Sequence, residues 1–132
     1  MNFRDAVRYF NKRFLNRLTS KIAQASWGPF AVIYHAGRRS GKLYETPIWV
    51  FPKVGGFVIA LTYGPQVDWY RNVSTAGRCR ILWHRHEYTI EKIESMEAKA
   101  ALPFFPRFIR MGLRLMGVGH FVQMKYRMVK PA

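Results

Sequence analysis

The sequence predicts an α+β domain whose antiparallel strands are able to close into a small barrel. The first observation is size: 132 residues, 49% hydrophobic and 16% aromatic, suffice to bury one core, so residues 1–132 are expected to form a single domain. The second is that short apolar runs alternate with turn residues in the middle of the chain, as antiparallel strands do. The third is that helical periodicity is confined to the N-terminal segment and to short stretches between and after the strands.

The N-terminal segment, residues 1–24, is expected to form an amphipathic, cationic helix. Lys and Arg separate apolar residues that recur at spacings of three and four: Phe3, Val7, Phe10, Phe14, Leu18 and Ile22. Pro29 ends the segment because proline cannot continue a helix. Two interpretations are open: the apolar stripe packs on the domain, or residues 2–23 lie in the headgroup region of an anionic membrane.

Strands are expected in the middle of the chain, near residues 30–36, 43–52, 56–62, 78–84 and 87–93. Two tight hairpin turns join neighbouring strands, one at Gly55-Gly56 and one at His84-Arg85-His86. Residues 120–128 alternate well enough to form a final strand.

Short helices are expected between and after these strands. The first has Asp68 as its N-cap and ends at Gly77. A second helical region begins near Ser95, is interrupted by Pro103 and Pro106, and resumes over residues 107–116.

The net charge of +15, from 22 Lys and Arg against 7 Asp and Glu, predicts an anionic partner. Nucleic acid, anionic lipid and a small cofactor carrying phosphate and carboxylates all qualify. No helix-turn-helix, RNP or zinc-finger signature is present, so specific nucleic-acid recognition is not expected. A single cysteine and the lack of an apolar stretch long enough for a signal peptide or spanning helix favour a cytoplasmic protein, with peripheral membrane association open.

The loop of residues 37–42 lies between two apolar, strand-like runs and is a candidate anion site. Its glycines let backbone N–H groups converge on an oxyanion, and its other side chains add donors. The loop residues are Gly37, Arg38, Arg39, Ser40, Gly41 and Lys42. A Walker A loop is excluded, because only three residues separate the glycines and Leu43 follows the lysine. A solvated hairpin loop explains the same residues equally well.

Other reactive residues offer little chemistry of their own. No cluster of Cys or carboxylates completes a metal site around His84 and His86, so no metal is expected. Cys79 is expected to be a small buried residue, and His35 either donates to a ligand or simply ends a strand. Since no Ser-His-Asp set is visible, an enzyme of this sequence would rely on a cofactor.

The stretch "GRRSGKLYETPIWV", followed after a Gly-Gly hairpin by "TYGPQVDWYRN", resembles the deazaflavin-dependent nitroreductases, also called F420H2-dependent quinone reductases. These belong to the split β-barrel flavin and deazaflavin oxidoreductases. The resemblance covers roughly residues 25–95 in order and spacing and, more loosely, the whole chain. It implies a split β-barrel that binds F420 in a groove on its side, with FMN as the alternative cofactor and a homodimer left open.

The resemblance also implies a site and a reaction. The loop residues Gly37 to Lys42 would hold the phosphate and anionic tail of F420, and the ring would be bordered by Thr46, Pro47, Ile48, Tyr63, Gly64, Trp69 and Asn72. Reduced F420 would transfer a hydride to a small-molecule acceptor such as a quinone, an enone or a nitro compound. Tyr63 and Tyr70 are the expected catalytic proton donors.

One segment departs from the pattern of that family. The stretch "LPFFPRFIRMGLRLMGVGHF" contains no tyrosine where active members present several. A wall rich in Arg, Phe and Met would suit a lipophilic acceptor. The alternative is a non-catalytic carrier of a lipophilic or tetrapyrrole ligand on the same scaffold.

Overall fold

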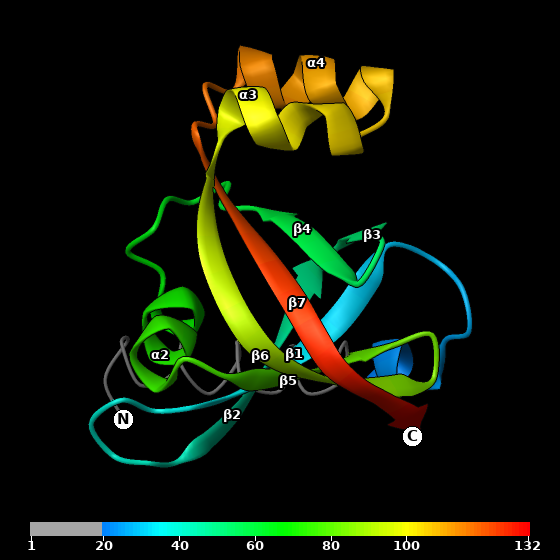
Figure 1. Cartoon of the computed structure of the whole chain (residues 1–132), viewed down its shortest axis with the longest axis vertical. Helices are drawn as coiled ribbons and strands as arrows, with labels where there is room; N and C mark the ends of the chain where they lie inside the picture. The colour runs from blue at the N-terminus through cyan, green and yellow to red at the C-terminus, as the bar shows by residue number, and fades with distance from the viewer. Residues whose placement is uncertain (1–19) are drawn as a thin grey trace, which may run out of the picture.

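The computed structural model describes residues 20–132, which form one strongly curled antiparallel sheet with short helices at its borders (Figure 1). The described strands are β1 (Phe30–Ala36), β2 (Leu43–Trp49), β3 (Phe51–Lys53), β4 (Gly56–Ala60), β5 (Cys79–Trp83), β6 (His86–Glu97) and β7 (His120–Pro131). Their order in the sheet is β2-β1-β5-β6-β7-β4-β3. Since Val50 alone joins β2 to β3, the two edges of the sheet lie close together and the sheet curls into a half-barrel.

Both predicted hairpin turns are confirmed. His84 and Arg85 have φ of 50° and 62°, the left-handed geometry of a tight turn between β5 and β6. Gly55 has φ of 78° between β3 and β4. The next residue, Gly56, has a different role: a Cβ placed there would lie 2.0 Å from the carbonyl oxygen of Met124 in β7. Glycine at position 56 therefore lets β4 pair closely with β7.

The main core fills the inside of the curl. It is built mainly from alternate residues of the strands, together with Val50 and Leu61 next to strand ends and Val73 of the helix that follows β4: Ala31, Ile33, Ile48, Val50, Phe57, Ile59, Leu61, Val73, Cys79, Ile81, Ile90, Val122 and Met124. A second cluster lies under the helices that follow β6, around Leu102, Phe105, Leu113 and Phe121. Residues 20–24 are helical, and Ile22 packs on Val32 and Leu82. The rest of the predicted N-terminal helix lies outside the described residues.

Three expectations about element boundaries are wrong. The strand expected over residues 43–52 is broken at Val50 into β2 and β3. Strand β6 runs on to Glu97 because Ser95 pairs with Val122 of β7, so the helical region begins at Ala98 and not near Ser95. Asp68 is the first residue of α2 (Asp68–Ala76) and not its N-cap, a position that Val67 occupies without a side-chain hydrogen bond. The end of α2 at Gly77, with φ of 74°, is confirmed.

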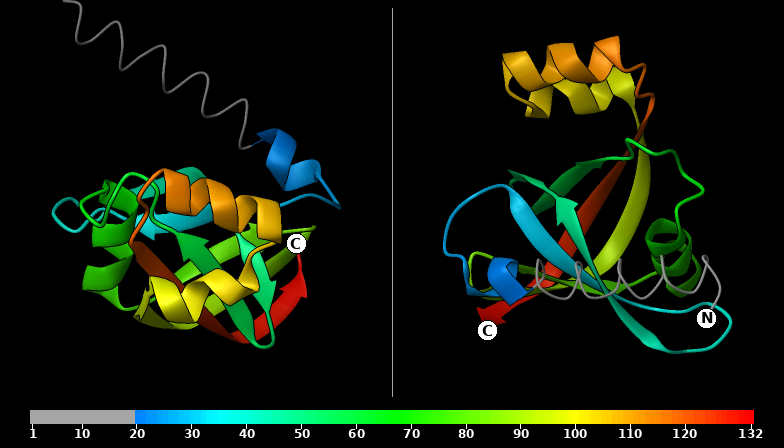
Figure 2. Two further views of the ribbon diagram at one scale, coloured as in Figure 1. Left: turned by 90° about the horizontal axis from the view of Figure 1, so that it is seen from above. Right: turned by 180° about the vertical axis from the view of Figure 1, so that it is seen from behind.

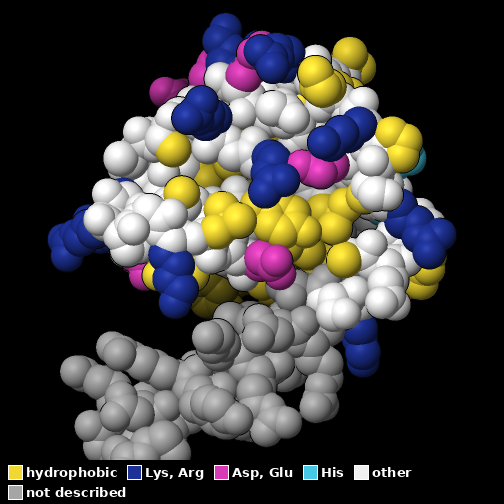
Figure 3. Space-filling model, turned by 90° about the horizontal axis from the view of Figure 1, so that it is seen from below, with side chains coloured by type: hydrophobic (Ala, Val, Ile, Leu, Met, Phe, Trp, Pro, Cys, Tyr) yellow, Lys and Arg dark blue, Asp and Glu magenta, His cyan; other side chains and the backbone are white. Residues whose placement is uncertain are grey.

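The helices gather at two places on the sheet (Figures 1 and 2). After β6, α3 (Ala98–Ala101), the 3-10 turn η1 (Leu102–Phe104) and α4 (Arg107–Leu115) form the end of the molecule opposite the C-terminus. Helix α2 lies beside the strands, against β1. Among the helices that the structure describes, none is long and apolar enough to cross a membrane. Seen from below (Figure 3), Lys and Arg side chains surround a band of hydrophobic ones, as the charge of +15 leads one to expect.

Candidate functional site

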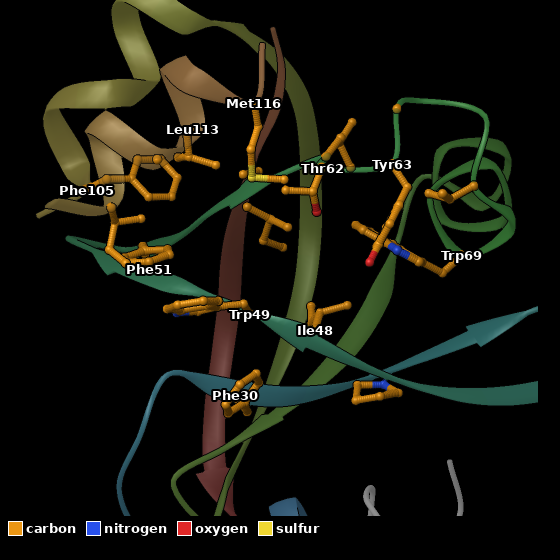
Figure 4. Close-up of a pocket in the computed structure, with 18 residues that line it drawn as sticks. Phe30, Ile48, Trp49, Phe51, Thr62, Tyr63, Trp69, Phe105, Leu113 and Met116 are labelled. Carbon is orange, nitrogen blue, oxygen red and sulfur yellow. The ribbon is translucent and has the colours of Figure 1, made fainter. Parts of the chain in front are cut away.

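A cavity of about 530 Å³ lies between the curled sheet and α4 (Figure 4). Its volume is typical of small-molecule and cofactor sites. Strands β2 to β4 form one side, the segment between β4 and α2 a second, and α4 with the residues before it a third. The lining is predominantly apolar: Phe30, Pro47, Ile48, Trp49, Phe51, Ile59, Ala60, Leu61, Thr62, Tyr63, Gly64, Val67, Trp69, Phe105, Ile109, Gly112, Leu113 and Met116. The cavity therefore suits a ligand with an apolar body.

An aromatic row follows one side of the cavity. Trp49 stacks on Phe51 with the ring centroids 5.5 Å apart and the planes inclined by 20°, and it also lies 5.7 Å from Phe30. Phe51 in turn lies 4.3 Å from Phe105. The register of β1 and β2 places Phe30 opposite Trp49, and the two-residue spacing of Trp49 and Phe51 favours a common face. Such a row offers π surfaces to a flat ring system.

Polar side chains on the cavity wall are few and neutral: Thr62, Tyr63 and Trp69. Phe105 and Met116 line the cavity, as expected of the segment after Pro103. The expectation that arginines of this segment also form the wall is wrong, since none of them lines the cavity. Arg110 instead bends back, and its Nε and Nη2 donate to the carbonyl oxygens of Leu102 and Phe105, each at 3.1 Å. The cavity can therefore hold the apolar part of a ligand, while charges on that ligand need partners outside it.

The loop of residues 37–42 uses most of its backbone N–H groups within the protein. Three of these hydrogen bonds stay inside the loop: Gly37 to the carbonyl oxygen of Lys42 at 2.7 Å, Gly41 to that of Gly37 at 2.8 Å, and Lys42 to Ser40 Oγ at 3.1 Å. A fourth joins the Arg38 N–H to Asn72 Oδ1 at 3.1 Å. The N–H groups of Arg39 and Ser40 have no acceptor among the described residues. An anion at this loop would thus meet two free amides rather than a full ring of them.

The cations of this loop differ in their surroundings. Arg38 is tied to α2, because its Nη1 donates to Asn72 Oδ1 at 2.8 Å and its Nη2 to Asp68 Oδ1 at 3.3 Å. Arg39 and Lys42 are exposed and form no ion pair within residues 20–132. Asp68 lies between Val67 and Trp69, which both line the cavity, so Arg38 ties the loop to the helix turn beside the cavity, although no residue of the loop lines the cavity itself.

A buried hydrogen-bond chain holds the loop in place. The backbone N–H and the Nη1 of Arg38 both donate to Asn72 Oδ1. Asn72 Nδ2 therefore faces His35 and donates to its Nδ1 at 3.0 Å. The neutral imidazole then carries its proton on Nε2, which donates to Thr46 Oγ1 at 2.8 Å. Burial lowers the pKa of His35, and the charge of Asp68 opposes this only in part. His35 and Asn72, 6% and 5% exposed, thus act as a neutral pair that joins β1 to α2.

The lowered pKa of His35 predicts that the stability of the fold decreases as the pH is lowered. An unfolded histidine titrates near pH ~6.5, so below that pH the unfolded chain takes up a proton that the folded chain resists. The contribution is full above this pH and is lost as the pH falls through the lowered folded pKa. We expect the Tm to decline between pH 7.5 and pH 5, and His35→Gln to make that decline shallower. Thermal unfolding of both proteins, with the exposed-site variant His86→Gln as the control, measures this; equal slopes would contradict it.

The structure places the expected site residues outside the loop of residues 37–42 in three groups. Five of them line the cavity: Pro47, Ile48, Tyr63, Gly64 and Trp69. Thr46 and Asn72 do not line it but belong to the chain of hydrogen bonds through His35. Tyr70 does not line it either, and its Oη lies 3.2 Å from Ser95 Oγ of β6.

Sequence reasoning missed Phe30, Trp49 and Phe51 as cavity residues. The alternation of Trp49 and Phe51 was a usable signal, whereas Phe30 required the register of β1 and β2. The role of His35 as a partner of Asn72 had no signal at all, because the two residues lie 37 positions apart.

Cys79 is buried, as expected. Burial raises the pKa of its thiol to about 12, so it is not a ready nucleophile. Within residues 20–132, no group of three His, Cys, Asp or Glu side chains is placed to hold a metal ion.

No family model matches the chain, and no curated protein matches its sequence. Several solved structures share its fold. General Stress Protein 26 from Bacillus anthracis is 13% identical with a TM-score of 0.62, over 88% of this chain and 96% of that one. HutZ, the heme storage protein from Vibrio cholerae, is 9% identical with a TM-score of 0.61, over 89% and 94%.

An FAD-binding protein from Mesorhizobium loti is 10% identical with a TM-score of 0.53, over 86% and 90%. At such identities the likeness concerns the fold alone. The chain has the split β-barrel fold, a curled antiparallel sheet with a few short helices, and the predicted fold class is confirmed.

Proposed function

We propose that this protein is an oxidoreductase that uses reduced F420, or alternatively FMN, to reduce a lipophilic, electron-poor acceptor such as a quinone, an enone or a nitro compound. The observation that carries the proposal is an aromatic-lined cavity beside the helix turn to which Arg38 ties a cationic loop, whose Arg39 and Lys42 form no ion pair within residues 20–132. The sequence resemblance and the flavin bound by one protein of the same fold support it. A homodimer that completes the groove stays a prediction.

The residues present fit a cofactor with a planar ring and an anionic tail. The aromatic row of Phe30, Trp49 and Phe51 suits the ring. No lining residue is charged, so a bound ring would not bury a charge without a partner. Leu43, the first residue after the loop, lies four residues from Pro47 on the cavity wall, about 13 Å along an extended strand. A tail reaching that far would meet the free cations of the loop.

A bound reduced deazaflavin or flavin supplies a hydride. The apolar walls exclude water and hold a lipophilic acceptor by burial of its surface. A donor is also needed where negative charge develops on the acceptor. We assign this role to Tyr63 rather than to Tyr70, because Tyr63 borders the cavity and is 83% exposed, whereas Tyr70 is directed at Ser95.

The two free cations are expected to bind the tail, and Arg38 to position the loop. Arg39→Ala/Lys42→Ala should weaken F420 binding about tenfold without lowering the Tm, because charge-assisted hydrogen bonds are lost only in the complex. Arg38→Ala should lower affinity and Tm together, since Asn72 Oδ1 loses its guanidinium partner. Fluorescence titration with F420 and thermal unfolding measure both effects. Arg78→Ala/Arg127→Ala removes the same charge elsewhere; an equal loss of affinity there would show non-specific attraction.

Turnover separates the reductase from a ligand carrier of the same fold. The purified protein is expected to oxidise reduced F420 when menadione, cyclohexenone or a nitroimidazole is present, and Tyr63→Phe is expected to slow this reaction about tenfold or more. If the protein binds reduced F420 yet never oxidises it with any of these acceptors, the reductase proposal is wrong and the carrier alternative stands.

A further inference from the structure

Helix α4 is apolar over a wider arc than its packing requires. Ile109 and Leu113 face the fold, where Leu113 is 7% exposed. On another face, a stripe at spacings of three and four is open to solvent: Phe108 at 74% exposed, Met111 at 60% and Leu115 at 83%. We call these three side chains the outer stripe. Three large apolar residues on one helical face are more than the scattered exposure of an ordinary surface.

Cations that form no ion pair among the described residues lie along one edge of the outer stripe. Arg107 and Arg114 lie next to it on the helical wheel, are exposed, and take part in none of the ion pairs of residues 20–132. Glu97, before α3, is the last acidic residue of the chain. An apolar stripe edged by arginines is typical of helices that lie in the interface of an anionic membrane.

We propose that α4 docks on an anionic lipid surface, with the outer stripe among the acyl chains and Arg107 and Arg114 at the headgroups. A second copy of the chain fits this face less well. A two-fold interface would bring the same arginines of both copies to one place, with no carboxylate on α4 to balance them. Anionic lipid is complementary to both the apolar and the charged parts of the helix.

Docking in this way would connect the cavity to the bilayer. Another side of the same helix lines the cavity through Ile109, Gly112 and Leu113, and Met116 at its C-cap does so too. In Figure 1, α4 forms an outer end of the molecule, so a flat surface can reach it. The docking itself does not depend on the proposed function. Only its consequence does, namely that the acceptor is a molecule dissolved in the membrane.

Site-specific labelling tests which face meets the lipid. The full chain carrying Met111→Cys is labelled with an environment-sensitive fluorophore, while the buried Cys79, with a pKa of about 12, stays unreactive. Met128→Cys, 50% exposed near the far end of β7, is the matched control. With phosphatidylcholine vesicles containing phosphatidylglycerol, we expect the label at 111 to brighten several-fold and to be quenched by spin-labelled acyl chains, and the label at 128 to do neither.

Three outcomes would overturn the proposal. In the first, the protein sediments with vesicles while the label at 111 stays in water, which means that another face binds lipid. In the second, the label at 111 becomes shielded without lipid as the protein concentration rises, which means that a second copy covers α4. In the third, the protein does not bind anionic vesicles at all. None of these measurements involves cofactor or turnover, so failure here is distinguishable from failure of the proposed function.

Variants of the outer stripe provide an independent measurement. Phe108→Ser/Leu115→Ser is expected to weaken vesicle binding about tenfold or more, because two side chains lose their transfer into lipid. Neither residue lines the cavity, and both are exposed, so the Tm should hold. Met128→Ser/Val129→Ser is the control and should bind within twofold of the original protein. Equal weakening in both pairs would contradict a specific role of α4.

Discussion

Filling the cavity from Gly112 is expected to reduce turnover strongly while the fold is retained. Gly112 lies on α4 and lines the cavity, and a Cβ placed on it would meet nothing within 4 Å. Gly112→Leu therefore projects a side chain into the space that the ring or the acceptor needs. Leucine also favours a helix over glycine by roughly 0.8 kcal/mol, so the Tm should be unchanged or higher.

We expect kcat/KM for menadione with reduced F420 to fall about a hundredfold in Gly112→Leu, measured by steady-state kinetics. Gly112→Ala should lie between that variant and the original protein, since it adds one methyl group. Gly119→Leu is the matched control, because Gly119 also has open space around its Cβ but does not line the cavity. Unchanged kinetics in Gly112→Leu, with the protein folded, would mean that the reaction takes place elsewhere.

Gly56→Ala is expected to destabilise the protein by about 3 kcal/mol or more. The added Cβ would lie 2.0 Å from the Met124 carbonyl oxygen, 3.0 Å from its carbon and 3.2 Å from Lys125 Cα. All three atoms are backbone of β7, so no side chain can rotate away and the strands themselves must separate. That separation would loosen the hydrogen bonds between β4 and β7, over Gly56–Ala60 and Phe121–Lys125.

Thermal unfolding measures this effect. A loss of about 3 kcal/mol lowers the Tm of a chain this size by roughly 10 °C. Gly112→Ala is the control, since it adds the same methyl group in open space. A Tm of Gly56→Ala within 3 °C of the original protein would show that β4 and β7 can move apart without cost.

Local signals predicted the secondary structure well and its boundaries less well. The hairpin turns at Gly55 and at His84-Arg85, and the end of α2 at Gly77, follow from backbone conformations that few residues adopt. The extension of β6 to Glu97 had no local signal, because it results from pairing with β7 across an irregularity in register near Ile90. Asp68 looked like an N-cap but is held by Arg38, 30 residues earlier.

The candidate site divides in the same way. The composition of residues 37–42 by itself determined that cations and glycines gather in one loop, and the segment after Pro103 determined that an apolar wall was available. Only the tertiary structure decided that Arg38 donates hydrogen bonds to Asn72 and Asp68, which leaves Arg39 and Lys42 to bind a ligand.

Only the tertiary structure, likewise, placed Gly112 and Met116 opposite Trp49 across a cavity. The physical reason is that composition and periodicity act over a few neighbouring residues, whereas cavities and hydrogen-bond partners arise where distant segments pack. The sequence alone therefore determined which chemical groups this protein has, and the curl of its sheet decided which of them meet.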